Sequence, residues 1–122
     1  MDVPALRRRF DRFIAEGRSI DLFEDGGEIL GFATHSEEET QAAPSGYHVH
    51  LHEFYIDRAY RRRGLGVQAF GLLAATRWRP GMRVVLDVLE TNMAGRAFWT
   101  KVGFRPYSTA MEIFLPPESS VD

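Results

Sequence analysis

The sequence contains no cysteine, which excludes disulfide bonds, thiolate nucleophiles and cysteine-bound zinc or iron–sulfur clusters. It has no apolar run near the roughly 20 residues that a membrane-spanning helix needs. Arg7, Arg8 and Arg9 are not followed by the apolar stretch of a secretory signal, so we expect a cytoplasmic protein without a membrane partner. Lysine occurs only at Lys101, and a formal net charge of −2 gives no basic field to attract nucleic acid.

The composition is that of a globular protein of ordinary domain size. Of its 122 residues, 44% are hydrophobic and 26% are charged, which excludes wholesale disorder. We expect one domain over residues 1–117 and a short tail over 118–122.

Hydrophobic periodicity divides the chain into helices and strands. An amphipathic helix is expected from Val3 to Ile14, and the Asp25-Gly26-Gly27 turn predicts a hairpin of residues 20–23 and 29–34. The polar segment 36–46 is expected to be a mobile loop. The remaining predicted elements are a strand over 48–56, a helix over 66–78, a strand over 82–89, a helix between Asn92 and Gly103, and a strand over 108–115. This order predicts an α+β (α/β-like) fold, with a mixed sheet that is antiparallel early and parallel in its middle.

The turn Arg61-Arg62-Arg63-Gly64-Leu65-Gly66 joins a predicted strand to a predicted helix. The start of a helix presents unpaired amide groups and the positive end of the helix dipole, both of which favour a bound phosphate. Gly64 and Gly66 have no side chains to keep an anion away from the backbone. The turn is therefore either a phosphate-binding site or a solvated basic turn that glycine tightens.

Two blocks of the sequence resemble the GNAT superfamily of N-acetyltransferases. The block FYIDRAYRRRGLGVQAFGLL resembles the acyl-CoA-binding region, whose Gln/Arg-x-x-Gly-x-Gly/Ala motif is matched by Arg61, Gly64 and Gly66. The block VVLDVLETNMAGRAFWTKVGF resembles the downstream strand, asparagine, helix and terminal Gly-Phe of the family. Together they cover residues 51–105 in the expected order and spacing. The resemblance implies a mostly antiparallel mixed sheet with two splayed central parallel strands, flanked by about three helices.

The resemblance also implies how acetyl-CoA, the acyl donor, is bound. The backbone of three residues before the turn would bond the pantetheine amides, namely Phe54, Tyr55 and Ile56. Arg61 and the backbone after it would hold the pyrophosphate, through Arg62, Arg63, Gly64, Leu65, Gly66 and Val67. Asn92 would contact the cofactor as well as cap its helix, and Trp99 would pack on the pantetheine end.

Members of this family catalyse attack of an amine on a thioester, which requires a base. Asp87 lies in an otherwise apolar predicted strand, where a buried carboxylate needs a partner, so it is either the base or half of a salt bridge to an arginine. His50 is the second candidate for the base, because a neutral imidazole suits the task near neutral pH.

His50 also belongs to an alternating series with His48 and His52, all expected on one strand face, with Glu53 and Tyr55 on the other. The pattern could bind a metal, but the sequence fixes no acidic residue beside it and the family needs no metal, so we expect none. The histidines are otherwise expected to line the acceptor cleft, and Glu53 is a further candidate for the base.

Two departures from the family pattern limit the resemblance. Trp99 stands where the family usually has a tyrosine that protonates the leaving thiolate, and an indole is no practical acid. The chain also has one helix where the family commonly has a strand and two helices before the hairpin. Either an upstream start is missing or the sheet lacks an edge strand, and an exposed edge favours a homodimer.

Three functions follow from these features. The first is an acetyl-CoA-dependent N-acetyltransferase (EC 2.3.1.-) that acts on a primary amine of a small molecule, protein or peptide. The second is an acyl-CoA-binding module that has lost catalysis. The third, a nucleic-acid-binding domain that uses Arg7–Arg9 and Arg61–Arg63, is disfavoured by the net charge.

Overall fold

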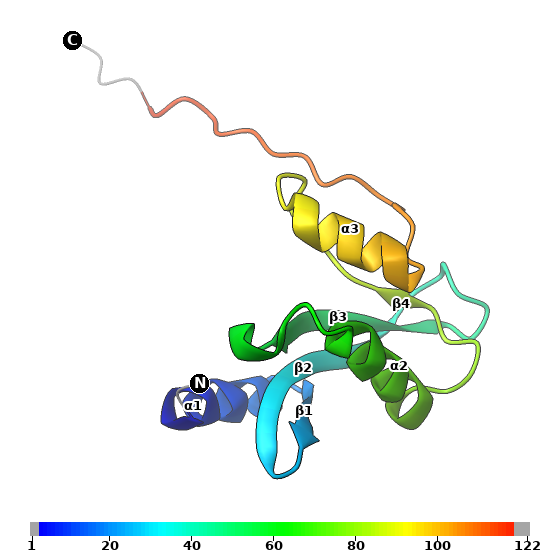
Figure 1. Cartoon of the computed structure of the whole chain (residues 1–122). Helices are drawn as coiled ribbons and strands as arrows, with labels where there is room; N and C mark the ends of the chain where they lie inside the picture. The colour runs from blue at the N-terminus through cyan, green and yellow to red at the C-terminus, as the bar shows by residue number, and fades with distance from the viewer. Residues whose placement is uncertain (1–2, 119–122) are drawn as a thin grey trace. The chain divides into compact units, whose positions relative to one another are not determined.

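The structure is a computed structural model that describes residues 3–118 (Figure 1). The chain forms two compact units. The first unit, Met1–Leu89, contains two helices and a four-stranded sheet. Its elements are α1 (Val3–Ala15), β1 (Ser19–Asp25), β2 (Glu28–Glu39), β3 (Tyr47–Ile56), the 3-10 helix η1 (Arg58–Tyr60), α2 (Leu65–Arg77) and β4 (Val84–Val85). The second unit, Glu90–Asp122, contains the helix α3 (Met93–Val102).

The sheet has the order β1-β2-β3-β4. β2 is antiparallel to both β1 and β3, and β4 is parallel to β3. The predicted mixed sheet and its flanking helices are therefore confirmed. β1 lies at one edge of this order, and the homodimer that an exposed edge favours stays a prediction.

The predicted hairpin is confirmed as β1 and β2. Gly26 and Gly27 both have positive φ angles, +58° and +84°, as a tight turn between twisted antiparallel strands requires. Glycine adopts these angles without a steric penalty, which explains the Gly-Gly pair at this point.

A bulge in β3 decides which side chains share a face of the sheet. Thr34 pairs with Glu53 and His35 pairs with Leu51, so His52 is an extra residue on β3. Because directly paired residues point to the same side, Glu53 lies on the same face as Thr34. The expectation that Glu53 and Tyr55 lie opposite the histidines is therefore wrong, because it assumed a regular strand.

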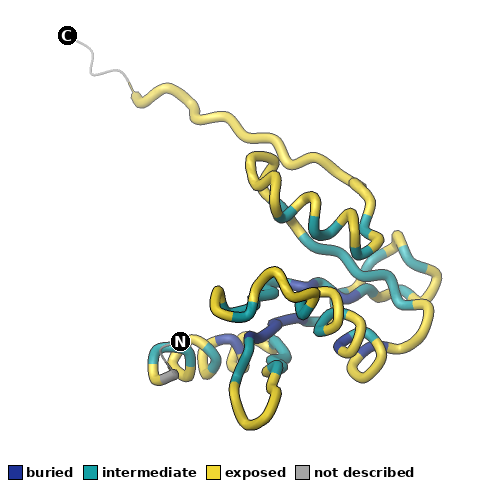
Figure 2. Tube along the Cα trace, in the orientation of Figure 1, coloured by how far each residue is buried: buried dark blue, intermediate teal, exposed yellow. Residues whose placement is uncertain are grey.

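The two faces of the sheet are covered by different helices. On one face, Phe10 of α1 packs edge-on against Phe32, and Arg9 pairs with Glu53 at 2.6 Å. On the other face, Phe70 of α2 and Trp78, which follows α2, pack against Phe54 and His35 respectively. Figure 2 shows that buried residues follow β2 and β3, where both faces are covered.

Three predicted segments differ from the structure. The expected loop over 36–46 is shorter, because β2 continues to Glu39 and the turn is closed by a hydrogen bond from the Thr40 amide to the Gly46 carbonyl (2.8 Å). The strand expected over 82–89 pairs only at Val84 and Val85. Residues 108–115 form no strand, because alternating apolar residues favour a strand only where a partner supplies hydrogen bonds.

The helix predicted between Asn92 and Gly103 is confirmed as α3. The Asn92 side chain caps it by accepting a hydrogen bond from the Gly95 amide at 3.0 Å. Gly103, at φ +125°, ends it, and its amide donates to the carbonyls of Trp99 and Thr100. Within this unit the Trp99 ring contacts the rings of Phe98 and Phe104.

Of the described helices, none combines the length and the apolar character needed to cross a membrane. A single domain over residues 1–117 stays a prediction. In the expected tail, residue 118 is in neither a helix nor a strand, and residues 119–122 lie outside the described part of the chain.

We predict that Gly31→Ala destabilises the sheet. A Cβ at Gly31 would lie 2.0 Å from the Tyr55 carbonyl oxygen, which belongs to the backbone of the neighbouring strand and cannot rotate away. Forcing β2 and β3 apart should lower the free energy of unfolding by about 1–3 kcal/mol or more, measured by urea unfolding.

Gly71→Ala is the matched control for that substitution. Gly71 lies inside α2, and a Cβ there would meet no atom within 4 Å. Alanine should stabilise this helix by about 0.5–1 kcal/mol. Equal stability of Gly31→Ala and the wild-type protein would contradict the close approach of β2 and β3.

Candidate active site

The parallel strands β3 and β4 pair over a very short distance and then separate. Their register pairs Val49 with Val84 and His50 with Val85, and the Val49 amide donates to the Arg83 carbonyl at 2.9 Å. Beyond this point β3 continues to Ile56, while the chain after Val85 leaves the sheet. Among the described residues, no strand pairs with this side of β3 from Leu51 to Ile56. A strand edge without a pairing strand is a place where a ligand can hydrogen-bond a backbone, and the Ile56 carbonyl already accepts from Arg61.

The start of α2 presents backbone amides without a side-chain cap. Gly64 is the N-cap residue in the left-handed conformation (φ +71°), and its carbonyl accepts from the Gln68 amide at 3.2 Å. Arg62 also has a positive φ, +67°, which is unusual for a residue with a Cβ. The predicted residues Leu65, Gly66 and Val67 form the first turn of this helix. Such a turn favours an anion through its amides and its dipole.

The three arginines before α2 differ in what their side chains contact. Arg61 donates from Nε to the Ile56 carbonyl at 2.8 Å, and its guanidinium lies over the Tyr55 ring at 5.3 Å. Its side chain therefore fastens the turn to β3. Arg62 and Arg63 are exposed beside the helix start and add positive charge there.

The residues expected to bind pantetheine offer mainly their backbone. The Phe54 ring packs against Phe23 and Phe70, and the Tyr55 ring packs against Phe32. Their side chains therefore help to build the core, and hydrogen bonds to a ligand would come from main-chain groups.

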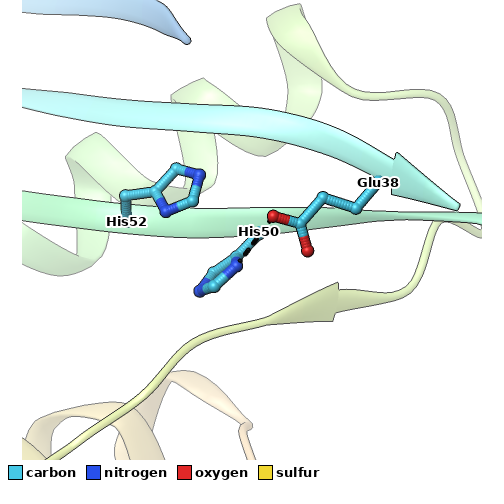
Figure 3. Close-up of side chains that lie close together, drawn as sticks. All are labelled: Glu38, His50 and His52. Carbon is cyan, nitrogen blue, oxygen red and sulfur yellow. Dashed lines mark hydrogen bonds and ion pairs between the residues drawn. The ribbon is translucent and has the colours of Figure 1, made fainter. Parts of the chain in front are cut away.

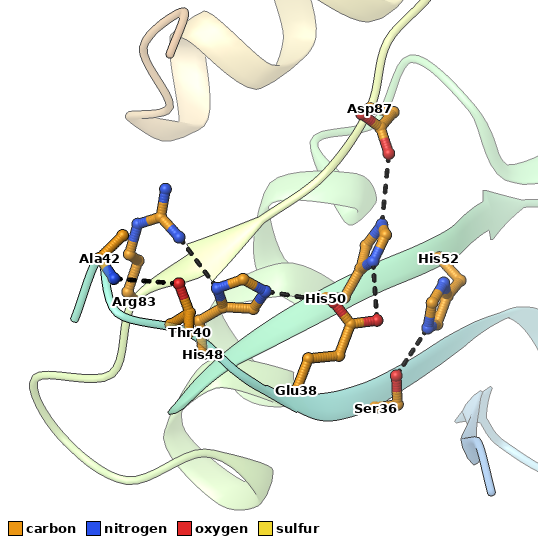
Figure 4. Close-up of polar contacts among 9 residues, drawn as sticks. All are labelled: Ser36, Glu38, Thr40, Ala42, His48, His50, His52, Arg83 and Asp87. Atoms are coloured by element: carbon orange, nitrogen blue, oxygen red, sulfur yellow. Dashed lines mark hydrogen bonds and ion pairs between the residues drawn. The ribbon is translucent and has the colours of Figure 1, made fainter. Parts of the chain in front are cut away.

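His50 lies between two carboxylates at the point where the strands separate. Its Nδ1 is 3.1 Å from Glu38 Oε2, and its Nε2 is 3.3 Å from Asp87 Oδ2 (Figure 4). A neutral imidazole has a proton for only one of these contacts, whereas a protonated ring can donate to both. Both ring nitrogens of His50 therefore face a carboxylate oxygen.

The neighbouring histidines are also hydrogen-bonded. Arg83 donates to His48 Nδ1 at 2.9 Å, which leaves His48 Nε2 as the donor to Glu38 Oε1 at 3.2 Å. His52 Nε2 is 2.7 Å from Ser36 Oγ. All three histidines thus reach polar groups on one face of the sheet, as the alternation predicted.

These contacts change the pKa values of two groups. Burial by itself raises the pKa of Glu38, but hydrogen bonds from His48 and His50 and the charges of both rings outweigh it, so the pKa is lowered. Burial lowers the pKa of His52, and the nearby charge of His50 lowers it further. Glu38 is therefore held as a carboxylate, and His52 is held as a neutral imidazole.

Asp87 is not the buried carboxylate that the apolar sequence around it predicted. It lies after β4 and its side chain is 91% exposed, because the chain has already left the sheet. The His50 side chain is only 24% exposed. Asp87 thus meets His50 from the solvent side, a histidine instead of the arginine that the alternative expected.

The other predicted residues lie apart from this cluster or in the second unit. Glu53 is paired with Arg9 of α1. Asn92 and Trp99 belong to α3 and its cap, in the second unit. Tyr60, which ends η1 and was not among the predicted site residues, donates its hydroxyl to Glu28, and this hydrogen bond raises the pKa of Tyr60.

Glu38 is the residue that the sequence analysis missed. It falls in the segment 36–46, which was expected to be a loop. Residues 34–39 are all polar and show no alternation of apolar and polar side chains, so no local pattern marked the continuation of the strand. The register then places Glu38 opposite His48.

The sequence model of the acetyltransferase (GNAT) family matches residues 2–104, and the chain belongs to this family. Membership confirms the resemblance and makes acyl transfer the general class of reaction. No curated protein shows significant sequence similarity to the chain.

Solved structures share the fold at low sequence identity. A mutant of a Bacillus halodurans protein is 21% identical, with a TM-score of 0.69 over 89% of this chain and 73% of its own. The glucosamine-6-phosphate N-acetyltransferase of Arabidopsis thaliana is 20% identical, with a TM-score of 0.62 over 90% of this chain and 76% of its own. An aminoglycoside antibiotic 6'-N-acetyltransferase of Acinetobacter haemolyticus is 15% identical, with a TM-score of 0.64 over 94% of this chain and 82% of its own.

Proposed function

We propose that the chain transfers an acetyl group from acetyl-CoA to a primary amine of a small molecule, protein or peptide. The observation that carries this proposal is the position of the His50–Asp87 pair, which lies where β3 and β4 separate. A base at that point adjoins the open edge of β3, and family membership favours acetyl-CoA as the acyl donor. The Arabidopsis neighbour is a glucosamine-6-phosphate N-acetyltransferase, and the Acinetobacter neighbour is an aminoglycoside 6'-N-acetyltransferase. Both names support an amine as the acceptor without identifying it.

The backbone supplies the proposed binding groups for acetyl-CoA. In this proposal β3 hydrogen-bonds the pantetheine amides near Phe54–Ile56, on the side where no described strand pairs, and the amides at the start of α2 bind the pyrophosphate. Gly64 fits this role because an added Cβ there would meet no protein atom within 4 Å, so the space beside the helix start is open. Arg62 and Arg63 add charge next to it. In this proposal Asn92 and Trp99 contribute from the second unit.

His50 is the proposed general base, and Asp87 positions it. The Asp87 side chain is 91% exposed and contacts His50 from the solvent side, where it can orient the ring. The His50 ring is mostly covered and has carboxylate partners for both nitrogens. It can therefore accept the proton that the amine loses as the C–N bond forms and the thioester C–S bond breaks.

The departing thiolate needs a proton that Trp99 cannot supply. Solvent can provide it, since a thiolate is a tolerable leaving group. A catalytically inactive acyl-CoA-binding module would share the cofactor site but not the function of His50. Turnover in the presence of an amine therefore separates the two functions.

The first prediction concerns the cofactor. Acetyl-CoA at about 100 times its dissociation constant should stabilise the wild-type protein by about 2.7 kcal/mol. Gly64→Val should abolish most of this stabilisation, because its side chain would occupy the space beside the helix start. The measurement is thermal unfolding of each protein with and without acetyl-CoA.

Gly81→Val is the matched control, because Gly64 and Gly81 have similar φ angles, +71° and +82°, and neither has an atom within 4 Å of an added Cβ. Both variants should be less stable when free, since valine is strained at a positive φ. Only Gly64→Val should lose the response to acetyl-CoA. An equal response of the two variants would contradict the phosphate site.

The second prediction concerns the base. His50→Gln should lower kcat by roughly 10²–10⁴-fold and remove the fall in rate on the acidic side of the pH profile. Asp87→Asn should cost less and keep that acidic limb, because its amide oxygen can still accept a hydrogen bond from His50. Steady-state kinetics over a panel of amines measures both.

A larger loss in Asp87→Asn than in His50→Gln would instead make Asp87 the base. Full activity in both variants would mean that water accepts the proton. Binding of acetyl-CoA without turnover of any amine would favour the inactive module.

The third prediction concerns Trp99. Trp99→Phe should lower kcat by at most about tenfold, through lost packing or a single lost hydrogen bond of roughly 1 kcal/mol. Trp99→Tyr restores the family's usual hydroxyl, so a higher kcat would show that protonation of the thiolate limits the wild-type rate. Loss of activity in Trp99→Phe with acetyl-CoA binding retained would contradict a passive role for this side chain.

A further inference from the structure

Three side chains from neighbouring strands form a group of potential metal ligands. Glu38 comes from β2, and His50 and His52 come from β3 (Figure 3). One ligand atom from each lies within 4.8 Å of the other two. No other such group occurs in residues 3–118. The fold thus brings an acidic residue to the histidine pattern, which the sequence alone did not do.

We propose that Glu38, His50 and His52 bind a first-row transition-metal dication of the Zn²⁺ class. Two imidazoles and one carboxylate are a common ligand set for such ions. The site goes beyond the proposed acetyl transfer and departs from the expectation that the chain holds no metal.

The spacing of the ligand atoms suits one ion. Zinc lies about 2.0–2.2 Å from its nitrogen and oxygen ligands, so ligand atoms in a tetrahedral site are roughly 3.3–3.5 Å apart. Glu38 Oε2 and His50 Nδ1 are already 3.1 Å apart. The His50 and His52 rings lie side by side, with centroids 4.2 Å apart and an angle of 32° between their planes. Ligand atoms from all three side chains already lie within 4.8 Å of one another.

The alternation of β3 and its register with β2 produce this arrangement. His50 and His52 are two residues apart, and the His52 side chain reaches Ser36, which pairs with His50. Glu38 pairs with His48 on the same face, so both rings lie within reach of one carboxylate.

The proposed ligands have hydrogen-bond partners of the kind that metal ligands usually have. When His50 binds a metal through Nδ1, its Nε2–H can donate to Asp87, 3.3 Å away. Glu38 accepts from His48 through Oε1, which leaves Oε2 for the ion. Such outer partners orient ligands and strengthen metal binding.

Three protein ligands leave at least one coordination position open. Sites of this kind hold a water molecule or substrate at the open position, whereas structural zinc sites have four protein ligands. The proposed site is therefore one at which the metal can also bind an external ligand. If His50 is the base, as proposed above, a metal on Nδ1 would remove its capacity to accept a proton and should inhibit acetyl transfer.

Calorimetric titration of the full-length, tag-free and chelator-treated protein with Zn²⁺ tests the site without acetyl-CoA. We expect one Zn²⁺ per chain. Glu38→Gln and His52→Gln should each weaken binding by more than the roughly 10–100-fold that loss of an outer partner causes. Asp87→Ala, which removes only an outer partner, should fall within that smaller range.

Glu37→Gln is the matched control. Glu37 is the neighbour of Glu38 on β2, but it pairs with Val49 on the opposite face and its carboxylate contacts Arg79 at 3.5 Å. This variant should bind Zn²⁺ as the wild-type protein does. Unchanged affinity in both Glu38→Gln and His52→Gln, or no binding by the wild-type protein, would overturn the proposal.

X-ray absorption of the wild-type Zn²⁺ complex tests the site even if a variant does not fold. Scattering from two imidazoles is expected around the zinc, and a shell of oxygen alone would overturn the proposal. Because neither measurement uses acetyl-CoA or an amine, a negative result is distinct from failure of the proposed acetyl transfer.

Discussion

The extra residue in β3 is the constraint on which the rest of the first unit depends. Because His52 is inserted between Leu51 and Glu53, β3 changes its alternation while β2 stays regular. Residues on both sides of the bulge then lie on one face, where Glu53 meets α1 and the histidines meet Glu38. The opposite face keeps Val49 and Leu51 buried. A regular strand would send Glu53 into the apolar face, where a charge is costly to bury.

The candidate chemistry of this polar face lies at the point where β3 separates from β4. Parallel pairing ends at His50, so the histidine lies at the junction between a paired and an open strand edge. Asp87 reaches it from the chain that leaves the sheet, and Glu38 reaches it from β2. The same ring is thus suited to accept a proton and to bind a metal, and the two uses exclude each other. Acetyl transfer and metal binding would therefore compete for the His50 side chain.

Local sequence signals predicted most helices and the hairpin because those elements satisfy their own backbone hydrogen bonds. Asn92 and Gly103 mark the ends of α3, and Gly26-Gly27 marks the turn between β1 and β2. The signals were less successful for strands at the edge of the described sheet. The apolar run after Met82 contributes only Val84 and Val85 to β4, and residues 108–115 contribute no strand. A strand depends on a partner that its own sequence does not specify.

The sequence by itself determined the family, through a glycine motif and an asparagine–helix block whose spacing can be read along one dimension. It also determined that three histidines would alternate on one strand. Only the tertiary structure decided what those histidines face, because Glu38 comes from β2 whereas Arg83 and Asp87 come from the distant stretch that contains β4. The physical reason is register. A cross-strand contact depends on how two strands align, and one inserted residue such as His52 changes that alignment without leaving a signal in the local pattern.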